Sequence, residues 1–187
     1  MFDKACEILN KYVDDYAFID AEVYQKERVK IASNDAFSYY AFLDGYQTII
    51  PMVLAYPSQP VKWSGKGNGI LSRYSYGTDY HIVFRERIKK IENAFLELGV
   101  KSKGFVDISP IDERFAARLS TLGFIGKNQF LIHPKYGSFV YLACMIVDAK
   151  LAFKQSTLDD CGDCRICIDA CPSNALDNGY VRSKCIS

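Results

Sequence analysis

Residues 48–56 read Thr-Ile-Ile-Pro-Met-Val-Leu-Ala-Tyr, and this stretch sets the class of fold. It is nearly all apolar and has the length of a strand. A strand without a polar face is covered on both sides, so the stretch predicts the centre of a sheet with other elements packed above and below it. Pro57 and Pro60 end the pattern.

Helices are predicted before and after this strand, because apolar residues recur there at intervals of three and four positions. Gly99 and Gly123 are placed to end two of them. The fold class that follows is α+β, a mixed α/β sandwich. The expected helices are 3–16, 79–98 and 111–122, and the further strands are 37–42, 103–108, 129–133 and 138–148, the last two paired through a turn at 134–137.

The composition is that of an ordinary globular protein. Apolar residues make up 49% of the 187 residues and charged residues 24%, which excludes wholesale disorder and fibrous structure. The net charge of +1 gives no global electrostatic reason to bind nucleic acid, so tRNA binding would depend on a local basic patch. Because no apolar run reaches the roughly 18 residues of a membrane span and the N-terminus lacks a signal peptide, we expect a cytoplasmic protein with no membrane partner.

The C-terminal end carries a cysteine motif. Cys161, Cys164, Cys167 and Cys171-Pro172 have the spacing C-x2-C-x2-C-x3-C-P, which bacterial ferredoxins use for 4Fe-4S clusters. Structural zinc, the alternative, favours two separated C-x2-C pairs. Residues 151–187 are therefore predicted to be a ferredoxin-like iron–sulfur segment that follows an α/β domain at 1–150.

The number of clusters depends on Cys185. Two clusters held only by cysteine need about eight thiolates, whereas the chain has seven cysteines. Cys185 either completes a single cluster or joins Cys171 in a second, incomplete one. The ending Ser183-Lys-Cys-Ile-Ser187 has no helix stop or tail character, so we expect a truncated chain with one or two clusters.

Three segments together resemble the epoxyqueuosine reductase family. The first is Ser-Arg-Tyr-Ser-Tyr-Gly-Thr-Asp-Tyr-His at 72–81. The second is Val-Asp-Ile-Ser-Pro-Ile-Asp-Glu-Arg at 106–114 with Leu-Gly-Phe-Ile-Gly-Lys-Asn at 122–128, and the third is the cysteine motif with Lys-Cys-Ile-Ser at 184–187. The order and approximate spacing match from about residue 50 to the end, although the family's second cysteine motif is absent.

The resemblance implies a cobalamin- and iron–sulfur-dependent oxidoreductase that reduces epoxyqueuosine to queuosine in tRNA. It implies that 1–150 is the cobalamin-binding catalytic domain and that an external low-potential donor supplies electrons. Asp107 matches the family's catalytic acid. The residues that match cofactor-binding stretches are Arg73, Tyr74, Lys127, Asn128, Pro134 and Ser138, and the implied metal ligands are Cys161, Cys164, Cys167, Cys171 and Cys185.

The residues alone favour more modest roles. An aspartate shortly before Ser109-Pro110 is typical of a turn or a helix cap, although partial burial at the end of an apolar strand would let Asp107 keep a proton at neutral pH. Glu113 and Arg114 are expected to be a solvated or interlocking helix pair rather than catalytic groups. His81 and His133 are expected to be structural, because no other metal ligand neighbours either one in the sequence.

Other functions fit the same pattern. A reductive dehalogenase-like enzyme would use the same cofactors on a different substrate. An electron-transfer protein would need the cluster but no corrin, and a non-catalytic fragment would hold neither. Retention of iron and cobalamin after anaerobic reconstitution separates these alternatives.

Overall fold

The computed structural model describes residues 1–30, 42–57, 59, 62, 64–151 and 160–186. Its centre is strand β3 (Thr48–Ala55), which confirms the strand predicted there. Nearly every residue of β3 is buried. The strand expected at 37–42 lies outside the described residues, apart from Phe42.

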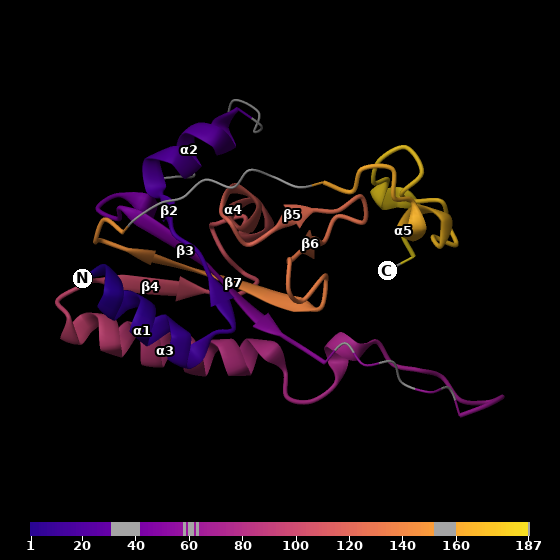
Figure 1. The fold of residues 1–187 in the computed structure, drawn as a ribbon, viewed down its shortest axis with the longest axis horizontal. Helices are drawn as coiled ribbons and strands as arrows, with labels where there is room; N and C mark the ends of the chain where they lie inside the picture. The colour runs from indigo at the N-terminus through magenta and orange to yellow at the C-terminus, as the bar shows by residue number, and fades with distance from the viewer. Residues whose placement is uncertain (31–41, 58, 60–61, 63, 152–159, 187) are drawn as a thin grey trace.

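The described strands form an antiparallel five-stranded sheet (Figure 1). β3 pairs along its whole length with β7 (Val140–Val147), from Thr48 opposite Val147 to Ala55 opposite Val140. β4 (Ser102–Phe105) covers the other edge of β7. On the far side of β3 lie two short strands, β1 (Asp15–Tyr16) and β2 (Ile19–Asp20).

Pro51 explains why the strand beside β3 is split. Proline has no N–H to donate, so it cannot complete a ladder within a sheet. The residues between β1 and β2 lie opposite this position, where the Ala17 N–H still donates to the Pro51 carbonyl at 3.1 Å. A proline in a central strand is thus tolerated because its neighbour is interrupted there.

The sheet has helices on both faces, which confirms the mixed α/β sandwich (Figure 1). α1 (Phe2–Tyr12) and α3 (Tyr80–Glu97) pack on one face, against alternate residues of β3 such as Ile50 and Met52. α2 (Ala21–Val29) and α4 (Glu113–Leu119) pack on the other face, which includes Ile49. This period of two is the geometry of a strand buried on both sides.

The helix predictions hold with changes at their ends. α3 agrees with the prediction, since Asp79 caps its start and Gly99, at φ 74°, follows its end. α1 ends at Tyr12 rather than 16, because the chain turns there into β1. α4 is shorter than predicted, because Asp112 caps it and the preceding residues form a loop. α2 was not predicted; Asp20 caps it, accepting the amides of Glu22 and Val23.

The predicted pairing of 129–133 with 138–148 is wrong. β6 (Leu131–Ile132) pairs instead with β5 (Phe124–Ile125) in a separate two-stranded hairpin. Both edges of β7 are already occupied by β3 and β4, so no edge is left for β6. An isolated β-bridge between His133 and Gly137 closes the turn that joins β6 to the segment leading into β7.

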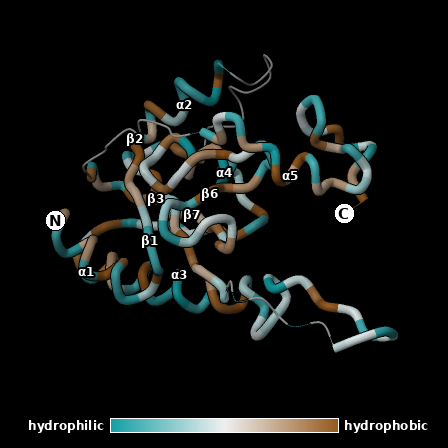
Figure 2. Tube along the Cα trace, turned by 45° about the vertical axis from the view of Figure 1, so that its right-hand side comes forward, coloured by the Kyte–Doolittle hydropathy of each residue, from teal (hydrophilic) through white to brown (hydrophobic). Residues whose placement is uncertain are grey.

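Two segments stand apart from the layered body (Figures 1 and 2). Residues 64–79, which precede α3 and contain the short 3-10 helix η3 (Arg73–Ser75), reach outward and expose Ile70 and Leu71. The cysteine segment, with α5 (Ile166–Asp169) and the 3-10 helix η4 (Arg182–Lys184), lies beside β5 and β6. None of the helices described is both long and apolar enough to cross a membrane.

Gly123→Ala is expected to destabilise the fold by about 2 kcal/mol or more. Gly123 has φ 146°, and a Cβ there would lie 2.2 Å from the Ile132 carbonyl oxygen. Gly99→Ala is the matched control, because Gly99 also has a positive φ but an added Cβ meets nothing within 4 Å. Urea unfolding measures both variants. An equal loss of stability in the two would contradict the steric argument.

Candidate functional site

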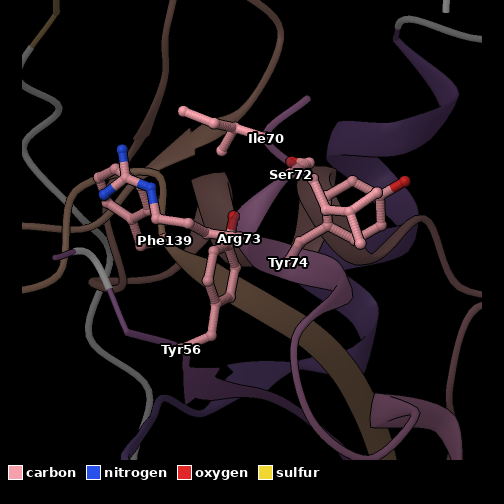
Figure 3. A pocket seen from close by; sticks show the side chains of 7 residues that line it. Tyr56, Ile70, Ser72, Arg73, Tyr74 and Phe139 are labelled. Carbon is pink, nitrogen blue, oxygen red and sulfur yellow. The ribbon is translucent and has the colours of Figure 1, made fainter. Parts of the chain in front are cut away.

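An open groove lies where β3 ends and β7 begins. Its volume is about 820 Å³. We call it the tyrosine groove, and its lining residues are Tyr56, Ser72, Tyr74, Tyr80, Glu113, Phe130, Ser138, Val140, Tyr141 and Leu142. A smaller hollow of about 420 Å³ continues from it along the connection to α3, sharing Tyr56, Ser72 and Tyr74 (Figure 3).

Stacked aromatic rings build the wall of the groove. The rings of Tyr80 and Tyr141 are parallel, with centroids 4.4 Å apart. The Tyr56 ring also packs against Tyr141, with centroids 4.7 Å apart. The Tyr141 hydroxyl donates to the Tyr74 carbonyl, which ties the outward connection to β7. The wall is therefore a cluster of tyrosine rings in mutual contact, one of them carried by strand β7 of the sheet.

Of two residues predicted to bind a cofactor, Tyr74 lines this groove and Arg73 lines the smaller hollow that adjoins it. The Arg73 guanidinium sits over the Phe139 ring at 4.6 Å from its centroid, and Figure 3 shows it beside the smaller hollow. Ser138, a third predicted residue, lines the groove, and its carbonyl accepts a hydrogen bond from the Tyr56 hydroxyl at 3.4 Å. The structure thus brings these three predicted residues together.

Asp79, His81 and Asp107 form an acid–histidine–acid chain next to two residues of the groove lining, Tyr80, which precedes His81, and Glu113, which accepts the Asp107 N–H. The His81 Nδ1 is 2.7 Å from Asp79 Oδ1, and its Nε2 is 3.4 Å from Asp107 Oδ2. The Asp79 carboxylate also accepts the His81 amide at 2.8 Å, because Asp79 is the N-cap of α3. The start of one helix therefore fixes the imidazole toward Asp107.

Asp107 occupies a constrained loop. Its φ is 61°, which is uncommon for a residue other than glycine. The Asp107 N–H donates to Glu113 Oε1 at 3.0 Å, so the first residue of α4 holds the loop in place. The Asp107 side chain is 61% exposed. The partial burial expected from the sequence is therefore not observed.

Glu113 is half-buried and hydrogen-bonded within this site, which excludes the solvated alternative that the sequence suggested for it. Burial raises its pKa to about 7, and the nearby charge of Asp107 acts in the same direction. The hydrogen bond from the Asp107 N–H opposes this rise. Glu113 also lines the groove. In the sequence, the signal that could have placed Glu113 in the site was its position six residues after Asp107, in the first turn of a capped helix.

The role expected for His81 also changes. The sequence suggested a structural histidine, but the structure places it between two carboxylates. Its hydrogen bond with Asp79, together with that to Asp107, raises its pKa above the ordinary value. An imidazole whose pKa is raised holds its proton more tightly, and one that contacts an exposed carboxyl can exchange a proton with it.

His133, by contrast, is structural as expected. It is buried, its Nδ1 accepts the amides of Lys135 and Tyr136, and its Nε2 therefore donates to Asp15 Oδ2 at 3.0 Å. Burial opposes the charge on Asp15, yet the hydrogen bond from His133 lowers its pKa. Pro134 lies in the turn held by this pair and lines neither the groove nor the smaller hollow.

Lys127 and Asn128 lie on the cysteine side of the molecule. The Lys127 Nζ donates to the carbonyls of Gly162 and Cys164, and its N–H donates to Cys161 Sγ. The Asn128 Oδ1 accepts the Phe130 amide within the β5–β6 turn. Neither residue lines the tyrosine groove.

The predicted cysteine ligands share one segment without converging. Within the described residues, no three His, Cys, Asp or Glu side chains are placed to hold a metal ion together. Hydrogen bonds from Ser173 and neighbouring amides lower the pKa of Cys171, which favours its thiolate. The assignment of Cys161, Cys164, Cys167, Cys171 and Cys185 as ligands stays a prediction.

Comparison with known proteins supports the resemblance found in the sequence. The family model "Epoxyqueuosine reductase QueG, DUF1730" matches residues 37–108. Epoxyqueuosine reductase of Bacillus anthracis is 38% identical over 153 residues, covering 78% of this chain. That of Staphylococcus aureus is 39% identical over 150 residues, covering 75% of this chain. This chain is homologous to the epoxyqueuosine reductases.

Solved epoxyqueuosine reductases have the same fold. One bound to an epoxyqueuosine-modified tRNA stem loop covers 99% of this chain with a TM-score of 0.81 and 29% identity, and this chain covers 56% of it. A second is a Bacillus subtilis epoxyqueuosine reductase whose catalytic aspartate loop is swung out of the active site. Its TM-score is 0.78 at 28% identity, and the match covers 99% of this chain and 55% of the Bacillus subtilis chain. The chain spans 40% of the Bacillus anthracis relative and 39% of the Staphylococcus aureus one.

Reductive dehalogenases share the fold more distantly. A catabolic reductive dehalogenase covers 92% of this chain with a TM-score of 0.57 and 13% identity, and this chain covers 22% of it. At that identity the likeness concerns the fold alone. The sheet with helices on both faces is therefore common to the epoxyqueuosine reductases and this more distant group.

Glu113→Gln is expected to change how stability depends on pH. A carboxyl with a pKa near 4.5 unfolded and about 7 folded binds more protons in the folded state between these values, so stability falls as pH rises through that window. The carbonyl of the introduced glutamine can still accept the Asp107 N–H, but the side chain does not titrate. Relative to the wild type, the variant should gain on the order of 1–3 kcal/mol between pH 5 and pH 7.5.

Urea unfolding at the two pH values measures this difference. Glu97→Gln is a control, because Glu97 ends α3 away from the groove and should leave the pH dependence unchanged. A wild-type and a Glu113→Gln protein with the same pH dependence would show that Glu113 titrates as an ordinary carboxyl.

Proposed function

We propose that this chain is the catalytic part of a reductase that converts epoxyqueuosine to queuosine in tRNA. The observation that carries the proposal is the Asp79–His81–Asp107 chain, whose exposed Asp107 carboxyl belongs to a residue hydrogen-bonded to Glu113 of the groove lining. An electron-transfer protein has no use for a proton-donating group at a groove. The homologues and the structure with a modified tRNA stem loop support the same substrate.

The groove fits cobalamin as its cofactor. A corrin is a large, mostly apolar ring, and the rings of Tyr56, Tyr80 and Tyr141 give the groove apolar surface for contact with it. Tyr74 and Ser138 line the groove and Arg73 lines the adjoining hollow, and these residues would contact the edge of the ring. Lys127, Asn128 and Pro134 do not line the groove, so we do not assign them to the corrin.

The cysteine segment has the donor set of a 4Fe-4S cluster. Thiolates at the ferredoxin spacing are the usual ligands of such a cluster. Cluster ligands commonly accept backbone hydrogen bonds, and the Lys127 amide already donates to Cys161 Sγ at 3.4 Å. Cys161, Cys164 and Cys167 would hold the cluster, with Cys171 or Cys185 as the fourth ligand.

Removing the epoxide oxygen as water takes two electrons and two protons. When bound, the cluster carries electrons singly from an external low-potential donor, and the cobalamin delivers them to the substrate. Asp107 donates a proton to the oxygen as its carbon–oxygen bond breaks. Its exposure lets it reach a substrate in the groove, and the Glu113 carboxylate keeps its loop in position.

His81 then restores the proton on Asp107. Its Nε2 lies 3.4 Å from Asp107 Oδ2, which is close enough for transfer after a small movement. Asp79 holds Nδ1 at 2.7 Å and stabilises the charged imidazole. The side chains thus form a route from solvent to the groove. Since the substrate is tRNA, we place the enzyme in the cytoplasm.

Asp107→Asn should lower the turnover of epoxyqueuosine-containing tRNA by about 10²–10⁴-fold, the range for loss of a general acid. The amide cannot donate the proton, whereas the tyrosine wall that contacts cobalamin is unchanged. The experiment uses the full-length protein, reconstituted anaerobically and given a chemical reductant. Cobalamin content is measured on the same samples.

Asp44→Asn is the matched control, since Asp44 is an exposed loop residue remote from the groove lining. It should keep wild-type turnover. Full activity of Asp107→Asn with normal cobalamin content would overturn the assignment of Asp107 as the acid.

A further inference from the structure

Lys127 joins the cysteine segment to the main domain through three donated hydrogen bonds. Its Nζ is 2.7 Å from the Gly162 carbonyl oxygen and 3.0 Å from that of Cys164. Its backbone N–H reaches Cys161 Sγ. All three acceptors lie in the first turn of the cysteine motif. A single residue therefore contacts both main-chain carbonyls and a cysteine sulfur of the predicted ligand loop.

The turn that carries Lys127 is built to hold its shape. The Gly126 N–H donates to the Phe130 carbonyl at 2.9 Å, and the Gln129 N–H donates to the Gly126 carbonyl at 2.8 Å. A Cβ at Gly126 would lie 2.7 Å from the Asn128 side-chain oxygen, so the turn closes tightly only around glycine. Asn128, predicted to bind a cofactor, instead accepts the Phe130 amide.

The same turn is tied to the acid site. Arg114 Nη1 donates to the Gln129 carbonyl at 3.2 Å. Arg114 follows Glu113 in α4, and Glu113 accepts the Asp107 N–H. A continuous series of contacts therefore runs from the cysteine motif through Lys127 and α4 to the Asp107 loop.

We propose that Lys127 is a positioning residue that docks the cysteine segment on the β5–β6 turn. Docking fixes where a cluster held by Cys161, Cys164 and Cys167 stands relative to the tyrosine groove. The cluster part of this inference rests on the proposed function, whereas the docking itself depends only on the chain.

The charge of Lys127 has a second consequence. Among the described residues it forms no ion pair with a carboxylate, and its ammonium group lies against main-chain carbonyls beside the ligand loop. Reduction adds a negative charge to a cluster, and a nearby cation favours the reduced form. Lys127 should therefore raise the reduction potential of the cluster as well as hold its segment.

Hydrogen exchange on the metal-free full-length protein tests the docking. Lys127→Met should make amides in 160–171 exchange at least tenfold faster, equivalent to about 1.4 kcal/mol, because both side-chain hydrogen bonds are lost. Lys127→Arg should keep most of the protection, since its guanidinium can still donate to two carbonyls. Lys90→Met, on the exposed side of α3, should match the wild type.

Two results would overturn the docking. One is wild-type exchange of 160–171 in Lys127→Met. The other is exchange in Lys127→Arg as fast as in Lys127→Met, and this comparison holds even if the methionine variant is generally less stable. Peptides from β3 and β7 report any such general loss in the same experiment.

The potential is measured by an EPR redox titration of the reconstituted protein. Lys127→Met should lower the reduction potential of the cluster. A tenfold loss of preference for the reduced cluster corresponds to ~59 mV for one electron. The potential of Lys127→Arg should stay close to that of the wild type. An unchanged potential would refute the electrostatic role. A protein that docks its segment but never reduces epoxyqueuosine would refute the proposed function and leave the docking intact.

Discussion

The antiparallel pairing of β3 with β7 is the constraint on which the rest of the structure depends. It joins residues 48–55 to residues 140–147 in an unbroken register, although the two strands are far apart in the sequence. Both strands are buried by helices on the two faces of the sheet, so a shift of one residue would turn every core side chain toward the wrong layer. The same register brings the end of β3 beside the start of β7, which is where the tyrosine groove opens.

The candidate site collects residues that the register brings to that end. Tyr56 and Tyr141 come from the two paired strands, whereas Tyr80 and His81 come from the first turn of α3. Asp107 follows β4 and is held by α4. The sheet thus supplies part of the wall, and the first turns of α3 and α4 with the loop after β4 supply the histidine and acid side chains. This division places the acidic groups next to the wall without interrupting the sheet.

The sequence predicted the central strand, the capped helix α3 and the mixed α/β class, because these depend on local periodicity and capping. It missed the β5–β6 hairpin, since local pattern cannot show that both edges of β7 are occupied. It did not show that His81 would reach Asp107, because that contact joins two separate segments of the chain. Asp107, Arg73 and Tyr74 were proposed through family resemblance rather than through residue pattern, and their roles stay predictions. Lys127 was assigned to the corrin, yet its contacts are with the cysteine segment.

The proposed function depends on cobalamin binding in the tyrosine groove. This binding is tested by EPR of the full-length protein, anaerobically loaded with cob(II)alamin and freed of unbound cofactor, beside a Tyr141→Ala variant. We expect the wild type to retain cob(II)alamin and the variant to retain much less. A wild type that retains no cobalamin, or a variant that retains as much as the wild type, would contradict it.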